Sequence, residues 1–261
     1  NQVDGADTLV ASCSACYLNL AKTESHLRHS PDLKGKVNDA LAAGGLSYEP
    51  GTLEIRHLLD IIFNDVGIEA IKEKVVRPLT GLRIAPYYGC MIVRPDFDNR
   101  YGSVEYPTAM DELMKALGAE VVYFPQKTHC CSGHMTQITP KVAYELIHRL
   151  VRAADQYKAD LMVTLCPMCQ LNLDVYQGDM NRHFKTDFHM PVLYFTQLMG
   201  LAFGYDPEEL GIGKEFVDAR DALAKIGVEV PVAEGPGKKP ARRRKKQEGL
   251  PMPRMPEEKN S

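Results

Sequence analysis

Apolar residues recur at helical spacing in two stretches of the first third of the chain. Residues 53–63 place leucines and isoleucines on one face of a helix, and residues 66–79 continue the same spacing. This pattern predicts two amphipathic helices. Closer to the N-terminus, a short apolar run in residues 6–12 ends at Cys13, and a helix-like stretch follows from Tyr17.

The second half of the chain alternates between strand and helix patterns. Strands are predicted at residues 82–89, 120–124 and 161–165, and helices at residues 107–117 and 140–157. Strands that alternate with helices in this way predict a parallel sheet with helices on both faces. We therefore expect an α/β fold.

Residues 6–20 and 159–173 form an internal repeat. The offset is 153 residues and 8 of the 15 aligned positions are identical, including both cysteines of a Cys-x-x-Cys pair. Similarity at this level indicates a tandem duplication. Three more cysteines precede the second copy, and their counterparts at the same offset would lie before residue 1: Cys90, Cys130 and Cys131. The sequence predicts two tandem Rossmann-like modules with parallel sheets, of which the first is N-terminally incomplete in this chain.

The duplication and the composition predict three regions. Residues 1–80 would be the C-terminal part of the first module with connecting helices, and residues 81–231 the complete second module. Residues 232–261 are rich in proline and carry seven basic residues between positions 238 and 246. This composition is typical of a flexible, solvated tail. A docking arm for an acidic partner subunit is the alternative.

The gross composition narrows the class of protein. With 261 residues, 44% hydrophobic and 25% charged, the chain is typical of a soluble globular protein. The net charge of −3 does not favour nucleic-acid binding, and no apolar run is long enough to span a membrane. The N-terminus lacks the features of a signal peptide. It begins with Asn1 rather than Met, which is typical of a fragment or a processed product.

Seven cysteines, two of them adjacent, indicate metal ligation or thiol redox chemistry in a reducing compartment. The complete module carries Cys90, Cys130, Cys131, Cys166 and Cys169, each just after a predicted strand. Because sites in open α/β sheets form at the carboxyl ends of strands, these thiols should converge on one edge. Five thiols exceed the four that zinc or a cubane cluster uses. A cluster of several irons is favoured over a thioredoxin-like dithiol or a structural zinc.

The pattern of a single cysteine, Cys-Cys-x-Gly and Cys-x-x-Cys resembles the duplicated cysteine-rich (CCG) domain found in the B subunits of heterodisulfide reductases. The resemblance covers residues 6 to about 215, and the segment Cys166 to Asp174 is similar to the ending of that family's second module. It implies a non-cubane 4Fe–4S cluster held by Cys90, Cys130, Cys131, Cys166 and Cys169. Cys13 and Cys16 match the last two ligands of a first-module cluster. One cluster is thus expected from this chain, and two if the intact protein carries a complete first module.

The resemblance implies the iron–sulfur catalytic subunit of a heterodisulfide reductase or a heterodisulfide-reductase-like complex, located in the cytoplasm. Its partners would be an iron–sulfur electron-donor subunit, other subunits of the complex, and a disulfide substrate or sulfur-carrier protein. One alternative is an electron-relay CCG subunit of a lactate- or glycolate-type dehydrogenase complex. A zinc-stabilised structural subunit is another. His129 and His134 flank the doublet as candidate ligands or proton donors, although polar loop residues are the favoured interpretation.

Overall fold

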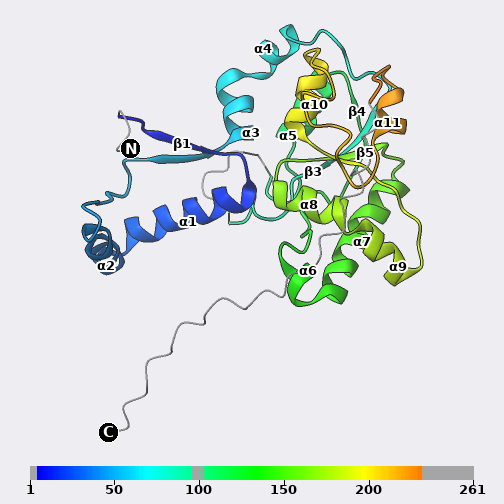
Figure 1. The fold of residues 1–261 in the computed structure, drawn as a ribbon. Coiled ribbons are helices and arrows are strands. Elements are labelled where there is room, and N and C mark those ends of the chain that lie inside the picture. Colours follow the sequence, from blue (N-terminus) through cyan, green and yellow to red (C-terminus); the bar gives the residue numbers. More distant parts are fainter. Residues whose placement is uncertain (1–4, 96–100, 102, 231–261) are drawn as a thin grey trace, which may run out of the picture. The chain divides into compact units, whose positions relative to one another are not determined.

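The chain forms two separate parallel sheets (Figure 1). This computed structural model describes residues 5–95, 101 and 103–230. The larger sheet has the strand order β4-β3-β5-β6, and the smaller sheet pairs β1 with β2. All the strand pairings among these residues are parallel. The predicted α/β class is therefore confirmed. The tandem Rossmann-like detail and the three domain boundaries stay predictions, and the predicted tail lies outside the described residues.

The larger sheet arises from the strands expected in the second half of the chain. β3 and β5 form its centre, with Ile84 opposite Leu161 and Tyr87 opposite Thr164. β4 is shorter than the pattern predicts, and β6 is an additional strand at the other edge. The bounds are β3 (Arg83–Tyr87), β4 (Glu120–Val121), β5 (Leu161–Thr164) and β6 (Val192–Tyr194).

Helices pack on both faces of the larger sheet, because alternate residues of each strand point to opposite sides. Ile84 and Val163 contribute to one buried cluster, and Ala85 and Met162 to the other. The first cluster includes residues of α5 (Ala109–Ala116), α10 (Phe195–Ala202) and α11 (Arg220–Ala224); the second includes residues of α7 (Pro140–Gln156), α8 (Pro167–Val175) and α9 (Gln177–Phe184).

The smaller sheet belongs to the first repeat. β1 (Thr8–Ala11) pairs in parallel with β2 (Glu54–His57), and α1 (Ser14–His29) and α2 (Pro31–Ala42) lie between them in sequence. Its core is small: Ala11, Tyr17 and Ile55 form the buried cluster. Leu9 and Val10 remain exposed on β1.

Two of the predicted helices are wrong in their extent. Residues 54–57 form strand β2, because Ile55 and His57 alternate inward with Glu54 and Arg56 outside. A strand of four residues shows too little alternation to stand out within the helical spacing of residues 53–63. A short helix, α3 (Leu58–Asp60), then continues as a π-helical segment, η1 (Ile61–Val66).

The second predicted helix, at residues 66–79, is only α4 (Ile68–Glu73). The helix ends at Glu73. Beyond it, the backbone N–H groups of Val76 and Arg77 both donate to the carbonyl of Ala202. In the described part of the chain, no helix is long and apolar enough to cross a membrane.

Candidate functional site

Five cysteines lie at the carboxyl ends of strands of the larger sheet. Cys90 follows β3, Cys130 and Cys131 lie in the loop after β4, and Cys166 and Cys169 begin α8 just after β5. The Sγ atoms of Cys131 and Cys169 are 3.2 Å apart. Cys90 and Cys130 line one cavity. The structure therefore brings these thiols together at one edge, as the strand pattern predicts; their roles as ligands stay a prediction.

Neighbouring thiols in this group form hydrogen bonds that shift their pKa values in opposite directions. The pKa of Cys130 is lowered to about 6, chiefly by a hydrogen bond from Cys90, and the same contact raises the pKa of Cys90. The pKa of Cys166 is lowered to about 5, chiefly by a hydrogen bond from Cys169. The pKa of Cys169 is raised well above its usual value by its contacts with Cys131 and Cys166. Some of the thiols are thus stabilised as thiolates, the form that binds metal.

The loop that carries the doublet is held by Asn172, which is buried on α8. Its amide group donates to the carbonyls of Cys131 (3.1 Å) and Gly133 and to the hydroxyl of Ser132 (3.3 Å). The backbone of this loop is unusual, since Ser132 and Gly133 have φ angles of 80° and 56°. The N–H of Ser132 donates to the Sγ of Cys130 at 3.3 Å. The loop then enters α6 (Met135–Ile138).

Asn172 was not singled out as a functional residue from the sequence. A signal for it was available, because it is one of the positions identical in the two repeats and corresponds to Asn19.

Gly89, which has no side chain, leaves space next to the thiol of Cys169. Gly89 directly precedes Cys90 and has a φ of +73°, which disfavours residues with a side chain. A Cβ at this position would lie 3.3 Å from the Sγ of Cys169 and 3.6 Å from the hydroxyl of Tyr87. The hydroxyl of Tyr87 donates to the carbonyl of His129 at 2.7 Å, so the end of β3 is tied to the loop of the doublet.

The first repeat also contributes a thiol next to this group. The Sγ of Cys13 is 3.9 Å from the Sγ of Cys166, the equivalent cysteine of the second repeat. The N–H of Ala15 helps to lower the pKa of Cys166. Burial raises the pKa of Cys13 itself to about 11. Cys16, by contrast, is exposed.

Two further residues connect the repeats, and neither was predicted. The hydroxyl of Tyr194, at the end of β6, donates to the carbonyls of Ser12 and Leu165, the residues just before the two Cys-x-x-Cys pairs. His57 ends β2 and is fully buried. Its ring is close to the carbonyl of Leu165, and burial lowers its pKa to about 4. The sequence offered no signal for either residue, because strands β2 and β6 were not predicted and both lie outside the aligned repeat.

The donor set fits a multi-iron cluster better than one metal ion. Among the described residues, no three His, Cys, Asp or Glu side chains are arranged to hold a single metal ion. The thiols instead form two sets of contacts: Cys130 contacts Cys90, and Cys169 contacts both Cys131 and Cys166. Soft thiolates spread over several ångströms suit a cluster that offers several irons.

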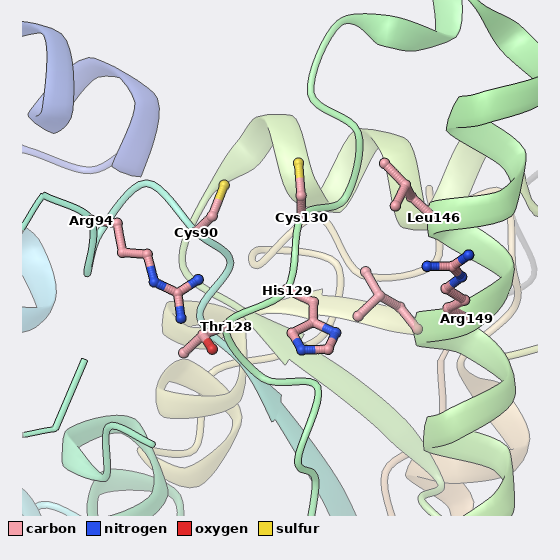
Figure 2. Close-up of a pocket in the computed structure, with 8 residues that line it drawn as sticks. Cys90, Arg94, Thr128, His129, Cys130, Leu146 and Arg149 are labelled. Atoms are coloured by element: carbon pink, nitrogen blue, oxygen red, sulfur yellow. The ribbon is translucent and has the colours of Figure 1, made fainter. Parts of the chain in front are cut away.

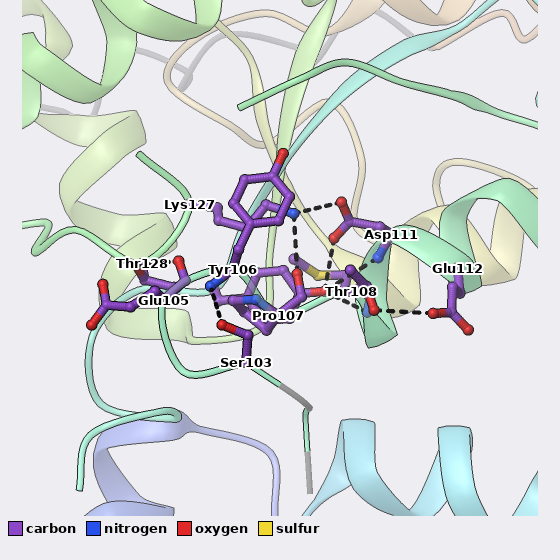
Figure 3. A network of polar contacts seen from close by, with 11 residues as sticks. Ser103, Glu105, Tyr106, Pro107, Thr108, Asp111, Glu112, Lys127 and Thr128 are labelled. Atoms are coloured by element: carbon purple, nitrogen blue, oxygen red, sulfur yellow. Dashed lines mark hydrogen bonds and ion pairs between the residues drawn. The ribbon is translucent and has the colours of Figure 1, made fainter. Parts of the chain in front are cut away.

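A buried charged network connects Lys127, Asp111 and Pro107 (Figure 3). Lys127 is fully buried and its Nζ lies 2.5 Å from a carboxylate oxygen of Asp111 and 3.1 Å from the carbonyl of Pro107. The hydroxyl of Tyr88 donates to the same carboxylate. The carbonyl of Lys127 accepts the N–H groups of Tyr88 and Gly89, which lead to Cys90. Composition cannot predict a buried lysine of this kind, because lysine is normally exposed.

The two histidines beside the doublet have different surroundings. His129 lines the cavity that contains Cys90 and Cys130 (Figure 2). His134 is exposed and does not line that cavity. The expectation that both serve mainly as polar loop residues stays a prediction.

Comparisons with known proteins agree with this arrangement. A family model described as a cysteine-rich domain (CCG) matches residues 84–174. The chain is 34% identical over 229 residues to the B subunit of the ferredoxin/F(420)H(2)-dependent CoB-CoM heterodisulfide reductase of Methanosarcina acetivorans, covering 85% of this chain and 74% of the relative. It is 36% identical over 211 residues to the 8-methylmenaquinol:fumarate reductase membrane anchor subunit of Wolinella succinogenes, covering 81% and 72%.

One solved structure is similar in fold. The crystal structure of a hypothetical protein from Helicobacter pylori matches with a TM-score of 0.60 and 16% sequence identity. The match covers 78% of this chain and 36% of that chain. This similarity supports the α/β architecture and carries no information on function.

Proposed function

The chain belongs to the CCG cysteine-rich family of heterodisulfide reductase B subunits, and we propose that it is the iron–sulfur catalytic subunit of a heterodisulfide-reductase-like complex. Its reaction would join or split a sulfur–sulfur bond. In the reductive direction, a disulfide takes up two electrons and two protons and gives two thiols. The observation that supports this most directly is the two sets of thiol contacts at the carboxyl edge of the larger sheet.

The proposed ligands are Cys90, Cys130, Cys131, Cys166 and Cys169, and the proposed cofactor is a non-cubane 4Fe–4S cluster. When bound, such a cluster supplies one-electron transfer and iron that can accept a sulfur ligand. Asn172 and the Ser132 N–H hold the doublet loop. Cys166 stands just before α8, where backbone N–H groups of Met168 and Cys169 lower its thiol pKa. These contacts orient the proposed ligands.

The role of Cys13 and Cys16 is a separate part of the proposal. We assign them as partial ligands of a first-module site. The N–H of Ala15 and the hydroxyl of Tyr194 connect that site with the second repeat. One cluster would come from the five cysteines of the complete module. A second would require the ligands that precede the Cys-x-x-Cys pair in a complete first module.

The proposed partners are an iron–sulfur electron-donor subunit, further subunits of the complex, and a disulfide substrate or a sulfur-carrier protein, in the cytoplasm. Support comes from those relatives that are B subunits of CoB-CoM heterodisulfide reductases.

A second candidate is an electron-relay subunit, which would pass electrons without binding a disulfide. The similarity to a membrane anchor subunit of an 8-methylmenaquinol:fumarate reductase favours this alternative. The zinc-stabilised structural subunit is a third candidate, which metal analysis separates from the other two.

The decisive experiment is a metal and sulfide analysis of anaerobically purified protein, with electron paramagnetic resonance spectra after mild oxidation with and without a thiol. About four irons per chain and a signal that changes with the thiol would support the catalytic subunit. An iron signal unaffected by any thiol would favour the electron relay. Zinc without iron would overturn both.

A further inference from the structure

Strands β2 and β6 occupy the same position relative to the two repeats. β2 pairs with β1 and places His57 opposite Ala11, whereas β6 pairs with β5 and places Tyr194 opposite Thr164. At the offset of 153 residues, Thr164 is the counterpart of Ala11. His57 and Tyr194 are therefore equivalent in register, although both lie outside the aligned repeat.

Each of these two side chains reaches the cysteine turn of the other repeat. The hydroxyl of Tyr194 donates to the carbonyl of Ser12, and the ring of His57 lies close to the carbonyl of Leu165. Ser12 and Leu165 are themselves counterparts at the same offset, and each directly precedes the first cysteine of its Cys-x-x-Cys pair. The two contacts are thus reciprocal, which is the arrangement that two-fold symmetry produces.

The ring of His57 is a donor toward the other repeat. Its Nδ1 accepts the N–H of Leu59 at 3.1 Å, and burial lowers its pKa to about 4, so the ring is neutral at neutral pH. A neutral imidazole that accepts at Nδ1 carries its proton on Nε2. This Nε2 is fully buried, and a buried N–H without an acceptor is costly. The carbonyl of Leu165 is an acceptor close enough to remove that cost.

The two cysteine turns meet at their first cysteines. The Sγ of Cys13 lies 3.9 Å from the Sγ of Cys166. The N–H of Ala15, in the first turn of α1, also contacts the sulfur of Cys166. The hydroxyl of Tyr194 adds a bond to the carbonyl of Leu165 at 3.3 Å, so one phenol holds both turns. The buried apolar cluster of the first repeat is small, so these polar contacts carry much of the junction.

We propose that His57 and Tyr194 form a reciprocal clamp between the two Cys-x-x-Cys turns. These positioning residues act through the backbone carbonyl that precedes each turn. The clamp keeps the Sγ atoms of Cys13 and Cys166 in contact, and it thereby determines the separation of the two proposed metal sites. The inference rests on the proposed function only in treating these cysteines as ligands, because the clamp itself belongs to the metal-free chain.

The test measures how readily the two turns can be joined in the full-length, reduced, metal-free chain. Exposed Cys16 is replaced by serine, so that Cys13 is the thiol that reports on the first repeat. Diamide then takes up two electrons and two protons and becomes a hydrazine, while two neighbouring thiols lose them and form a disulfide. Peptide mapping by mass spectrometry gives the rate of the Cys13–Cys166 link.

An internal reference lies within the complete module. The Sγ atoms of Cys131 and Cys169 are 3.2 Å apart, and neither residue belongs to the first repeat. The rate of the Cys13–Cys166 link is divided by the rate of this reference link in every variant. A change that unfolds the chain lowers both rates, whereas loss of the clamp lowers only the first.

Tyr194→Phe removes only the hydroxyl, and His57→Leu removes the N–H donor. We expect each to lower the ratio of the two rates about tenfold, because reaction between two groups depends steeply on their separation and orientation. His57→Gln, which keeps an N–H donor, should recover much of the ratio lost in His57→Leu. Tyr48→Phe is the matched control, because it removes a tyrosine hydroxyl bonded to Glu24 rather than to a cysteine turn, and it should keep the wild-type ratio.

Two results would overturn the clamp. One is a wild-type ratio in both Tyr194→Phe and His57→Leu. The other is a loss of both links in equal proportion, since that result indicates unfolding and not positioning.

Iron and sulfide analysis of the wild-type chain separates this inference from the proposed function. A chain that binds no iron but whose link depends on the clamp would overturn the proposed function and support the inference. A chain that binds about four irons, with the same ratio of rates in every variant, would do the reverse.

Discussion

Cys13 precedes α1 with a φ of −139° and a ψ of 124°, and Cys166 precedes α8 with a φ of −133° and a ψ of 118°. The two turns are nearly identical, yet their surroundings differ. Cys169 is buried whereas its counterpart Cys16 is exposed. Leu173 is 0% exposed and its counterpart Leu20 is 38% exposed. The local sequence therefore determines the strand–cysteine–helix turn, while neighbouring strands determine whether the thiols are enclosed.

The neighbours explain the difference. β5 lies between β3 and β6, but β1 pairs with β2 alone among the described strands. A groove of about 730 Å³ lies against the first repeat and includes Leu9 and Leu20. In the second repeat, the side chain of Leu173 at the position of Leu20 is packed into the core. The same sequence thus forms an enclosed site only where β3 and the doublet loop are present.

The sharpest way to test this contrast is to remove equivalent cysteines. Cys169→Ala should eliminate nearly all iron binding by the complete module, because its Sγ contacts Cys131 and Cys166. Cys16→Ala should retain most of the iron, because that thiol is exposed and lies outside the five proposed ligands. Iron and sulfide content after anaerobic reconstitution checks both. Equal iron loss in the two variants would contradict the ligand assignment.

Buried and exposed ion pairs give the next largest contrast. Lys127→Met should lower the free energy of unfolding by about 3–5 kcal/mol, because it leaves the Asp111 carboxylate buried without its cation. The double variant Lys127→Met/Asp111→Leu should recover much of that loss. Lys36→Met, which breaks an exposed ion pair with Asp32 on α2, should lower the free energy of unfolding by less than about 1 kcal/mol.

Urea denaturation of the full chain measures these three variants. A loss for Lys127→Met no larger than that for Lys36→Met would show that the network in Figure 3 does not stabilise the complete module.

Asn172 and Asn19 occupy equivalent positions in the two repeats, but Asn172 is buried and Asn19 is exposed. Asn172→Ala removes the donor to the carbonyls of Cys131 and Gly133 and should cost about 1–3 kcal/mol. Asn19 is exposed, so Asn19→Ala should change stability by less than about 0.5 kcal/mol. Denaturation of both variants, with the iron retained after reconstitution, measures the contrast. A cost at position 19 that matched the cost at position 172 would show that the two asparagines play equal parts.

The sequence predicted that the cysteines of the complete module converge at one edge of a parallel sheet, and the ligand roles of these cysteines stay a prediction. Cysteine positions relative to β3 and β5 follow from strand patterns, and strand ends of a parallel sheet share an edge. Strand β2 was missed because its four residues lie inside a helical spacing. Lys127 was missed because its role depends on a partner 16 residues away in sequence. Asn172 was missed, although it is identical in the two repeats, because its partners are 39 to 41 residues away. Tertiary contacts of this kind leave no local pattern.

The smallest expected effect concerns Glu24. At the offset of 153 residues, Glu24 is equivalent to Gln177. Each fixes the chain just before the strand that pairs with its repeat strand. Gln177 bonds the backbone of Met190, and Glu24 accepts from the N–H of Gly51 and the hydroxyl of Tyr48.

Burial alone would raise the pKa of Glu24, but hydrogen bonds from Tyr48, Arg28 and Gly51 outweigh it and lower the pKa. A lowered pKa contributes stability that is present above the usual value of about 4.5 and is lost as the pH falls through the folded-state value. Glu24→Gln should therefore cost about 1 kcal/mol at neutral pH. The difference from the wild-type chain should shrink as the solution is acidified. Hydrogen exchange of the Gly51 amide across that pH range measures it, and a difference that grew with acid would show that the charge of Glu24 opposes folding.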